Sequence, residues 1–414
     1  MATPTGLHAR RAALQMLDAV LRRGETLEQA APAALRQVRD GNDQALARAI
    51  AGEALRWLTD LDALIDGATK QNLPADAKPR SVLRLMLAQA LRLETPPHAV
   101  IATGLPLLSG GPRRLAHGVF STLTKRGARL PDIPTLPADV RERWGELARD
   151  IASGLAEPPE VDLHIREPDD TALWQTKLGG VSLATGHVRI PRGSRIDTLE
   201  GYKEGAWWVQ DLAAQIPAQL LGRASGHALD LCAAPGGKTM ALAALGWDVT
   251  ALDMSKRRLG VLKDNLKRTG LAASPVRADA LTWEPKHSYD AILLDAPCTA
   301  TGTCRRHPDV LHRIGARQIA EMAQVQRALL ERAAGWLKPG GTLIYAVCSL
   351  EREEGEAQAD RVSEKLGLKA APISAGECPA GLQPTSKGWL RTHPGQLPQA
   401  GGLDGFFIAR WRHP

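Results

Sequence analysis

Residues 227–411 alternate between short apolar segments typical of strands and longer amphipathic segments typical of helices. HALDLCA, DVTALD, YDAILLD and GTLIYAVCS are strand-like, and segments such as KRRLGVLKDNLKRTG stand between them. This alternation is typical of a parallel, doubly wound sheet with helices on both faces. We therefore predict an α/β domain over residues 223–414, with the apolar strand at 406–411 at the sheet edge.

The N-terminal part of the chain shows helical periodicity, with glycines and prolines between the periodic segments. These segments cover residues 8–23, 42–58, 78–94 and 112–126. We expect an all-helical domain over residues 1–130. Prolines concentrate in residues 131–159, which we interpret as a linker around one short helix. Short β-like pieces around a Gly-rich turn predict a small α/β connector over residues 160–222.

Positive charge is concentrated in the predicted helical domain. Residues 1–130 hold 18 Lys and Arg against 11 Asp and Glu, which leaves 34 of each sign for the rest of the chain. Such a potential attracts polyanions, and a nucleic acid is the commonest partner of this kind. An Arg-rich composition with a solvated helical surface explains the same numbers, so charge alone leaves both interpretations open.

The cysteine pattern and the lack of long apolar stretches bound the cellular context. Five cysteines without Cys-x-x-Cys spacing indicate neither a disulfide framework nor a structural metal. Residues 1–11 have no apolar run typical of a signal peptide, and no stretch of about 18 apolar residues follows. We expect a cytoplasmic protein with reduced thiols, no bound metal, no membrane partner and a monomeric state.

The first chemical motif is LDLCAAPGGKT at residues 229–239, where a strand runs into a glycine turn and a helix start. Such a turn lets backbone approach a ligand closely, although it also serves plain βα geometry. GKT resembles the end of a phosphate-binding P-loop. That motif needs a glycine where Cys232 stands, and Pro235 removes an N–H from the loop. We therefore reject an NTPase.

Acidic residues follow the next two strands, Asp253 in ALD and Asp279 in RADA. Acids at these positions hydrogen-bond ribose hydroxyls or an adenine amino group in nucleoside-binding sheets, although they also cap helices. A glycine turn with two acids and no phosphate cradle favours S-adenosylmethionine (SAM) over NAD or ATP.

Two cysteines follow the fourth and fifth strands, Cys298 in DAPCTATGT and Cys348 in YAVCSLEREEGE. Carbon 5 of cytosine accepts a methyl group only after a thiolate has added to carbon 6, so this reaction requires a cysteine nucleophile. A single free cysteine is more often a buried small side chain, the role we assign to Cys232, Cys304 and Cys378. Two at adjacent strand ends favour chemistry, and the spacing does not decide which attacks.

These motifs closely resemble the RNA cytosine-5 methyltransferases of the NOL1/NOP2/Sun family. The run DLCAAPGGKT, ALDMS, RADA, LLDAPCTATGT, AVCSLEREEGE and DGFFIARW covers essentially residues 160–414. The N-terminal 130 residues resemble the NusB-type RNA-binding domain, and bacterial Sun/RsmB proteins combine the two. The resemblance implies a Rossmann-like SAM domain and methylation of one cytosine in small-subunit (16S) ribosomal RNA.

The resemblance also implies roles for individual residues. Cys348 would attack carbon 6, Cys298 would assist product release, and Asp295 with Lys238 would contact the target base or help proton transfer. Val347 replaces the threonine of many relatives, which could alter hydrogen bonding at the neighbouring cysteine. The residues that would bind SAM are Cys232, Ala233, Ala234, Pro235, Gly236, Gly237, Lys238, Asp253, Asp279 and Asp295.

Two other functions compete with this one. A DNA cytosine-5 methyltransferase would use the cysteine of the Pro-Cys motif, Cys298, as nucleophile. A NusB-like RNA-binding assembly factor with a vestigial SAM fold would bind RNA and transfer no methyl group. Next to the expected pocket, Arg305, Arg306 and His307 would grip RNA phosphates or form a solvated loop. We expect Trp207 and Trp208 to pack the connector.

Overall fold

The computed structural model describes residues 6–414 and divides into two compact units. The helical unit reaches to Glu157 and includes Arg306–Ile314, and the α/β unit comprises Pro158–Arg305 and Gly315–Pro414. Residues 1–5, where the segment searched for a signal peptide begins, lie outside the described part. Within that part, no helix is both long and apolar enough to cross a membrane.

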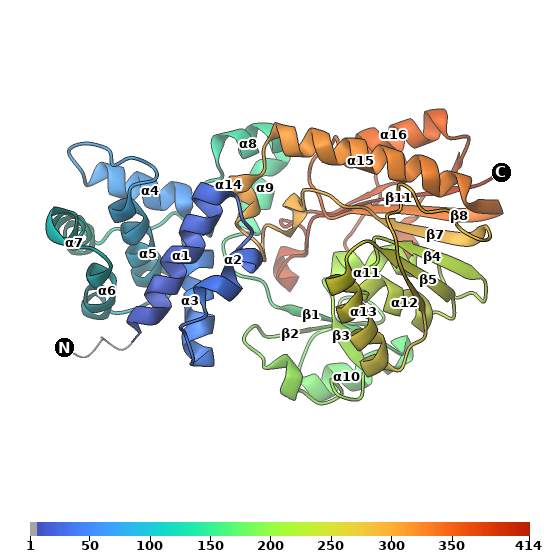
Figure 1. Cartoon of the computed structure of the whole chain (residues 1–414), viewed down its shortest axis with the longest axis horizontal. Coiled ribbons are helices and arrows are strands. Elements are labelled where there is room, and N and C mark those ends of the chain that lie inside the picture. The colour runs from blue at the N-terminus through green and yellow to red at the C-terminus, as the bar shows by residue number, and fades with distance from the viewer. Residues whose placement is uncertain (1–5) are drawn as a thin grey trace. The chain divides into compact units, whose positions relative to one another are not determined.

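The helical unit confirms the predicted all-helical fold (Figure 1), but it extends to Glu157, with helices over Ala138–Trp144 and Ala148–Ser153 where the sequence predicted a linker around one short helix. The segment predicted as one helix over 42–58 ends at Arg56, and a second helix starts at Leu58, because the backbone of Trp57 leaves the helical range with a φ of −106° and a ψ of 18°. The helices are α1 (Leu7–Arg23), α2 (Leu27–Ala34), α3 (Gly41–Arg56), α4 (Leu58–Gly67), α5 (Lys78–Arg92), α6 (Pro97–Gly104), α7 (Gly110–Lys125), α8 (Ala138–Trp144) and α9 (Ala148–Ser153).

A short segment distant in sequence completes this unit. Helix α14 (Val310–Arg313) contacts α1, and Val310 and Leu311 are buried. Nε2 of His312 lies 2.7 Å from the carbonyl oxygen of Leu55. The chain therefore leaves the α/β unit after Arg305 and returns to it at Gly315.

The large sheet of the α/β unit is parallel over five strands and turns antiparallel at one side. Its strand order is β10-β11-β8-β7-β4-β5-β6. Figure 1 shows α15 (Ala316–Gly335) and α16 (Glu356–Lys365) on one face, and α11 (Leu212–Gln219), α12 (Gly237–Ala244) and α13 (Lys256–Thr269) on the other. The strands are β4 (His227–Leu231), β5 (Asp248–Asp253), β6 (Ser274–Arg277), β7 (Tyr289–Asp295), β8 (Leu337–Val347), β9 (Lys369–Ala370), β10 (Leu390–Arg391) and β11 (Phe407–Arg412).

Strand β11 does not lie at the sheet edge as its sequence suggested. It pairs antiparallel with β8 along six residues, and the short strands β9 and β10 cover its other side. Phe407, Ile408, Ala409 and Trp411 are fully buried. A strand that is apolar on both faces must be covered by neighbouring strands and helices. The strands β9 and β10 that flank it here have no strong strand pattern in the sequence.

The connector forms a separate antiparallel sheet of β1 (Val161–Ile165), β2 (His187–Ile190) and β3 (Trp207–Val209), with α10 (Thr171–Leu178) beside it. Trp207 is 0% exposed and Trp208 is 3% exposed. Trp208 stacks on His164 with ring centroids 4.4 Å apart. The prediction that both tryptophans have a packing role is confirmed, although Trp208 also packs into the core of the large sheet, with Ala228 and Val249.

Candidate active site

The loop after β4 contains a turn that favours glycine. β4 ends at Leu231, α12 begins at Gly237, and Gly236 between them has a φ of 105°. A Cβ atom at Gly236 would lie 2.9 Å from Cγ of Leu262. A larger residue would therefore strain the backbone and displace core packing at once. Residues 232–237 form a short cradle that ends at the N-terminus of α12.

Three predicted carboxylates stand at or just after the ends of neighbouring strands. Asp253 is buried and accepts hydrogen bonds from the backbone N–H of Ala234 at 3.1 Å and of Ser255 at 2.8 Å, which ties the end of β5 to the loop after β4. Asp279 is exposed, and the side chain of Asp295 is 32% exposed. Three carboxylates that can accept hydrogen bonds, in a site that lacks a phosphate-binding loop, fit a nucleoside that carries a cationic sulfonium.

Lys238 is committed to Asp295 rather than to a phosphate. Its Nζ lies 2.7 Å from Oδ2 of Asp295 and 5.3 Å from the centre of the Phe406 ring. Burial lowers the pKa of Lys238, but the charge and hydrogen bond of Asp295 outweigh burial and raise the pKa overall. The side chain therefore stays a cation, and Cys348 is near enough to contribute to the same shift.

The two predicted cysteines meet at the ends of β7 and β8. Sγ of Cys298 lies 3.4 Å from Sγ of Cys348, far longer than a disulfide bond. Backbone hydrogen bonds hold the Cys298 loop, the loop after β7 that carries this cysteine. The N–H of Gly302 donates to the carbonyl oxygen of Cys348 at 3.0 Å, and the N–H of Gly405 donates to the carbonyl oxygen of Gly302 at 2.8 Å. The ends of β7 and β8 and the turn before β11 therefore all lie close to the two thiols.

Two thiols at this site have raised pKa values. Contact with Cys348, together with burial, raises the pKa of Cys298 well above its ordinary value. Burial, with the charges of Asp295 and Asp253, raises the pKa of Cys232 to about 12. Both remain thiols near neutral pH, and the pKa of Cys232 shows that the loop after β4 lies within electrostatic reach of both acids.

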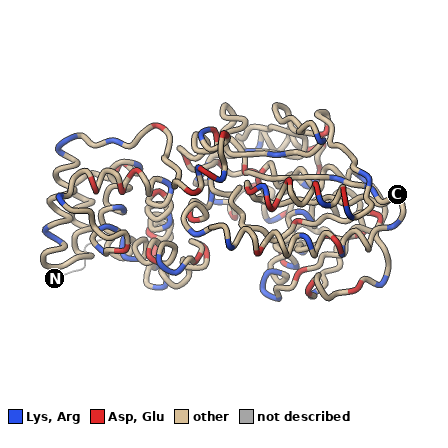
Figure 2. Tube along the Cα trace, turned by 90° about the horizontal axis from the view of Figure 1, so that it is seen from above, with Lys and Arg blue, Asp and Glu red and all other residues tan. Residues whose placement is uncertain are grey.

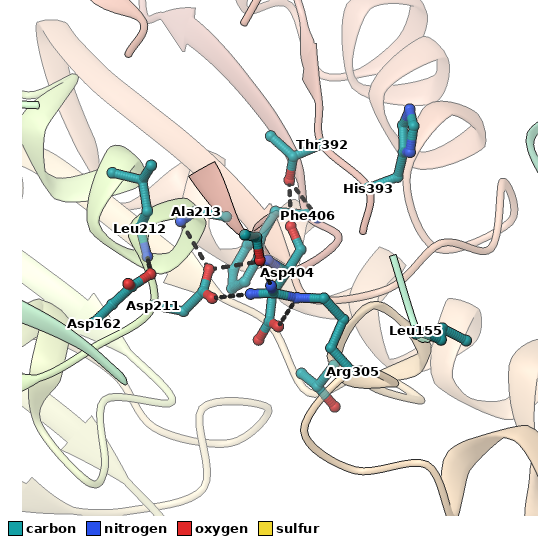
Figure 3. Close-up of polar contacts among 12 residues, drawn as sticks. Leu155, Asp162, Asp211, Leu212, Ala213, Arg305, Thr392, His393, Asp404 and Phe406 are labelled. Carbon is teal, nitrogen blue, oxygen red and sulfur yellow. Dashed lines mark hydrogen bonds and ion pairs between the residues drawn. The ribbon is translucent and has the colours of Figure 1, made fainter. Parts of the chain in front are cut away.

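Arg305 is a structural cation and not a free phosphate ligand (Figure 3). Its side chain is 3% exposed; Nη2 donates to Oδ2 of Asp211 at 3.1 Å and Nη1 donates to the carbonyl oxygen of Gly401 at 2.6 Å. Oδ1 of Asp404 lies 3.5 Å from its Nε. The next two basic residues belong to the helical unit, where Nε2 of His307 lies 3.9 Å from Glu28.

Comparison with known proteins identifies the family. The chain is 32% identical over 436 aligned residues to ribosomal RNA small subunit methyltransferase B of Salmonella arizonae, with 96% of this chain and 97% of that protein covered. The chain belongs to the RsmB/F family of 16S rRNA methyltransferases. The family model for 16S rRNA methyltransferase RsmB/F matches residues 218–412, and the NusB family model matches residues 7–107.

Solved structures agree with this fold. The crystal structure of PH0851 has a TM-score of 0.73 and 23% identity, covering 99% of both chains. NSun6 from Pyrococcus horikoshii, solved with SFG, has a TM-score of 0.58 and 21% identity, covering 67% of this chain and 98% of its own. This member of the RsmB/F family is therefore a SAM-dependent RNA methyltransferase, which excludes the non-enzymatic assembly factor.

Sequence reasoning missed the residues that hold the cysteine loops in place. Glu354 is fully buried beside both loops, although it lies only six positions after Cys348 in the quoted motif AVCSLEREEGE. Gly302 lies in the quoted motif DAPCTATGT and touches Gly405 of DGFF. Glu354 and Gly302 both stand inside motifs quoted from the sequence, which was a signal that they matter. The spacing of those motifs did not show that Glu354 lies beside the cysteine loops or that Gly302 contacts Gly405.

Proposed function

We propose that this RsmB/F-family enzyme methylates carbon 5 of a cytosine in 16S rRNA through a covalent adduct with Cys348. The observation that carries the proposal is the pair of sulfurs 3.4 Å apart at neighbouring strand ends. The resemblance to the RNA cytosine-5 methyltransferases supplies the choice of Cys348 as the attacking group, and the raised pKa of Cys298 agrees with a role for that residue other than attack. The spacing of the motifs alone left this choice open.

The proposed reaction gives each cysteine its own role, whereas Asp295 serves both the cofactor and the target base. The thiolate of Cys348 forms a bond to carbon 6 of the cytosine, which makes carbon 5 nucleophilic. SAM supplies the electrophilic methyl group, and residues 232–237 with Asp253, Asp279 and Asp295 would hold it. Loss of the carbon 5 proton to a base then breaks the carbon 6–sulfur bond and returns the thiolate. We assign assistance in this release to Cys298, and contact with the target base to Lys238 and Asp295.

Cysteine variants test this assignment. Cys348→Ala is expected to abolish methyl transfer and form no adduct, because the nucleophile is missing. Cys298→Ala is expected to accumulate a protein–RNA adduct that survives denaturing electrophoresis, because release is impaired. Cys304→Ala, in the same loop as Cys298, is the control and should retain both methyl transfer and release of the adduct. Mapping the modified base after incubation with SAM and protein-free rRNA identifies the product. Adduct formation by Cys348→Ala would assign the attack to Cys298, the pattern of a DNA cytosine-5 methyltransferase.

We also propose that the helical unit binds rRNA through α7 and the residues around it. Figure 2 shows basic and acidic positions interspersed along much of the chain. Residues 95–131 are an exception, because they contain no Asp or Glu. The stretch contributes five exposed basic side chains, and such a concentration of positive charge suits a phosphate backbone. They are Arg113, Arg114, Lys125, Arg126 and Arg129.

A further inference from the structure

One buried carboxylate lies between the two loops that carry the cysteines. Glu354 is 0% exposed, and every hydrogen-bond donor that reaches its side chain is uncharged. Its Oε2 accepts from the backbone N–H of Thr299 at 3.0 Å and from Nε2 of Gln326 at 2.8 Å. Its Oε1 accepts from Oγ of Ser349 at 3.0 Å and from Oγ1 of Thr299.

Two of the three donor residues directly follow the cysteines in the chain. Thr299 directly follows Cys298, and Ser349 directly follows Cys348. The carboxylate therefore joins the loop after β7 to the loop after β8, in addition to the Gly302 contact. Burying a carboxylate costs free energy unless it is well hydrogen-bonded, and four donors from three residues meet this need.

We propose that Glu354 is a positioning residue for methyl transfer, which sets the separation and orientation of Cys298 and Cys348 through Thr299 and Ser349. The inference rests on the proposed role of the two cysteines. Four short bonds to one rigid carboxylate restrict both loops, and misplacing a reacting group by about 1 Å costs up to ~100-fold in rate. The charge of Glu354 has a second effect, since it contributes to the raised pKa of Cys298 after Cys348 and burial.

The test replaces the carboxylate by its closest uncharged analogue. Glu354→Gln keeps the volume, but its amide nitrogen cannot accept the bonds that one carboxylate oxygen receives. The kcat for methyl transfer should fall ~10–100-fold while the KM for RNA and the Kd for SAM stay within about twofold. Per-site alkylation followed by mass spectrometry should show Cys298 reacting at lower pH than in the wild type. Glu353→Gln is the matched control, because Glu353 is adjacent and exposed.

A second variant covers the case in which Glu354→Gln fails to fold. Thr299→Val keeps the shape and the backbone N–H but removes the hydroxyl donor, so we expect the same changes to a smaller extent. Wild-type rates with an unchanged alkylation profile in these variants would overturn the positioning role. Equal losses of SAM affinity, RNA affinity and kcat would overturn it too, since they indicate general destabilisation. If the wild-type enzyme yields no 5-methylcytosine in the same assay, the proposed function itself fails, whereas the alkylation result still tests the link between Glu354 and Cys298.

Discussion

At the scale of single residues, neighbouring acids in one sheet differ in the hydrogen-bond donors that reach them. Asp253 accepts two backbone N–H groups and Asp295 pairs with Lys238. Asp230, inside β4, accepts one hydrogen bond, from Oγ1 of Thr239 at 2.5 Å, and among the described residues no donor reaches its Oδ1. Burial raises the pKa of Asp230 to about 7.

This raised pKa predicts a pH-dependent stability. The unfolded chain ionises Asp230 near pH ~4. The contribution of the neutral side chain to stability is therefore complete below that pH and is lost as the pH rises through about 7. Asp230→Asn cannot ionise, so its free energy of unfolding relative to the wild type should rise between pH 5 and pH 8 by at least ~1 kcal/mol.

Urea unfolding at both pH values measures this difference. Asp264→Asn is the control, because Asp264 is an exposed residue on α13. Parallel pH profiles for Asp230→Asn and the wild type would show that Asp230 is already ionised in the folded protein.

At the scale of elements, the Cys298 loop is held by backbone packing as well as by side chains. Gly302 lies against Gly405 in the turn before β11, and a Cβ atom at Gly302 would come within 1.9 Å of the carbonyl oxygen of Gly405. Both partners are backbone, so neither can turn aside as a flexible side chain would. The loop and the turn must therefore separate to admit any larger residue.

Gly302→Ala is expected to destabilise the protein by ~1–3 kcal/mol, as overpacking does, and to reduce methyl transfer because the Cys298 loop moves. Gly260→Ala is the control, since no atom lies within 4 Å of a Cβ there and alanine favours helix α13. Thermal unfolding and methyl transfer measure the two effects. A variant with wild-type stability and activity would show that the loop and the turn are not tightly packed.

At the scale of the whole molecule, charge and chemistry occupy different parts of the chain. The excess of basic residues lies in residues 1–130, and the predicted catalytic residues lie beyond residue 230. The acid-free stretch 95–131 extends past the part matched by the NusB family model, which ends at residue 107. RNA affinity and cofactor affinity should therefore respond to different substitutions.

The paired substitution Arg113→Gln and Arg114→Gln is expected to weaken rRNA binding and to reduce the slope of log K against log salt by up to ~2, because two phosphate contacts are lost. Arg39→Gln with Arg48→Gln is the matched control, since both are exposed arginines in a part of the helical unit that also carries acids. Binding titrations over several salt concentrations measure the slope. Equal losses from both pairs, or a fall in SAM affinity, would contradict a specific role for α7.

The sequence by itself determined the features that depend on neighbours along the chain. Strand and helix periods, the glycine turn at residues 232–237, and acids or cysteines just after strands are local patterns, and parallel strands place their carboxyl ends at one edge. This is why Asp253, Asp295 and both cysteines could be located before any coordinates were known. The family resemblance added which cysteine attacks, and that assignment stays a proposal.

Only the tertiary structure decided how distant segments meet. Glu354 reaches Thr299 across 55 positions, Arg305 pairs with Asp211 across 94, and α14 packs into the helical unit. Strand β11 became an inner strand because β9 and β10 cover it. Each of these contacts depends on how the folded segments fit together and become buried. A buried polar group bonds to whichever partner the fold brings near it, and the spacing of residues along the chain does not specify that partner.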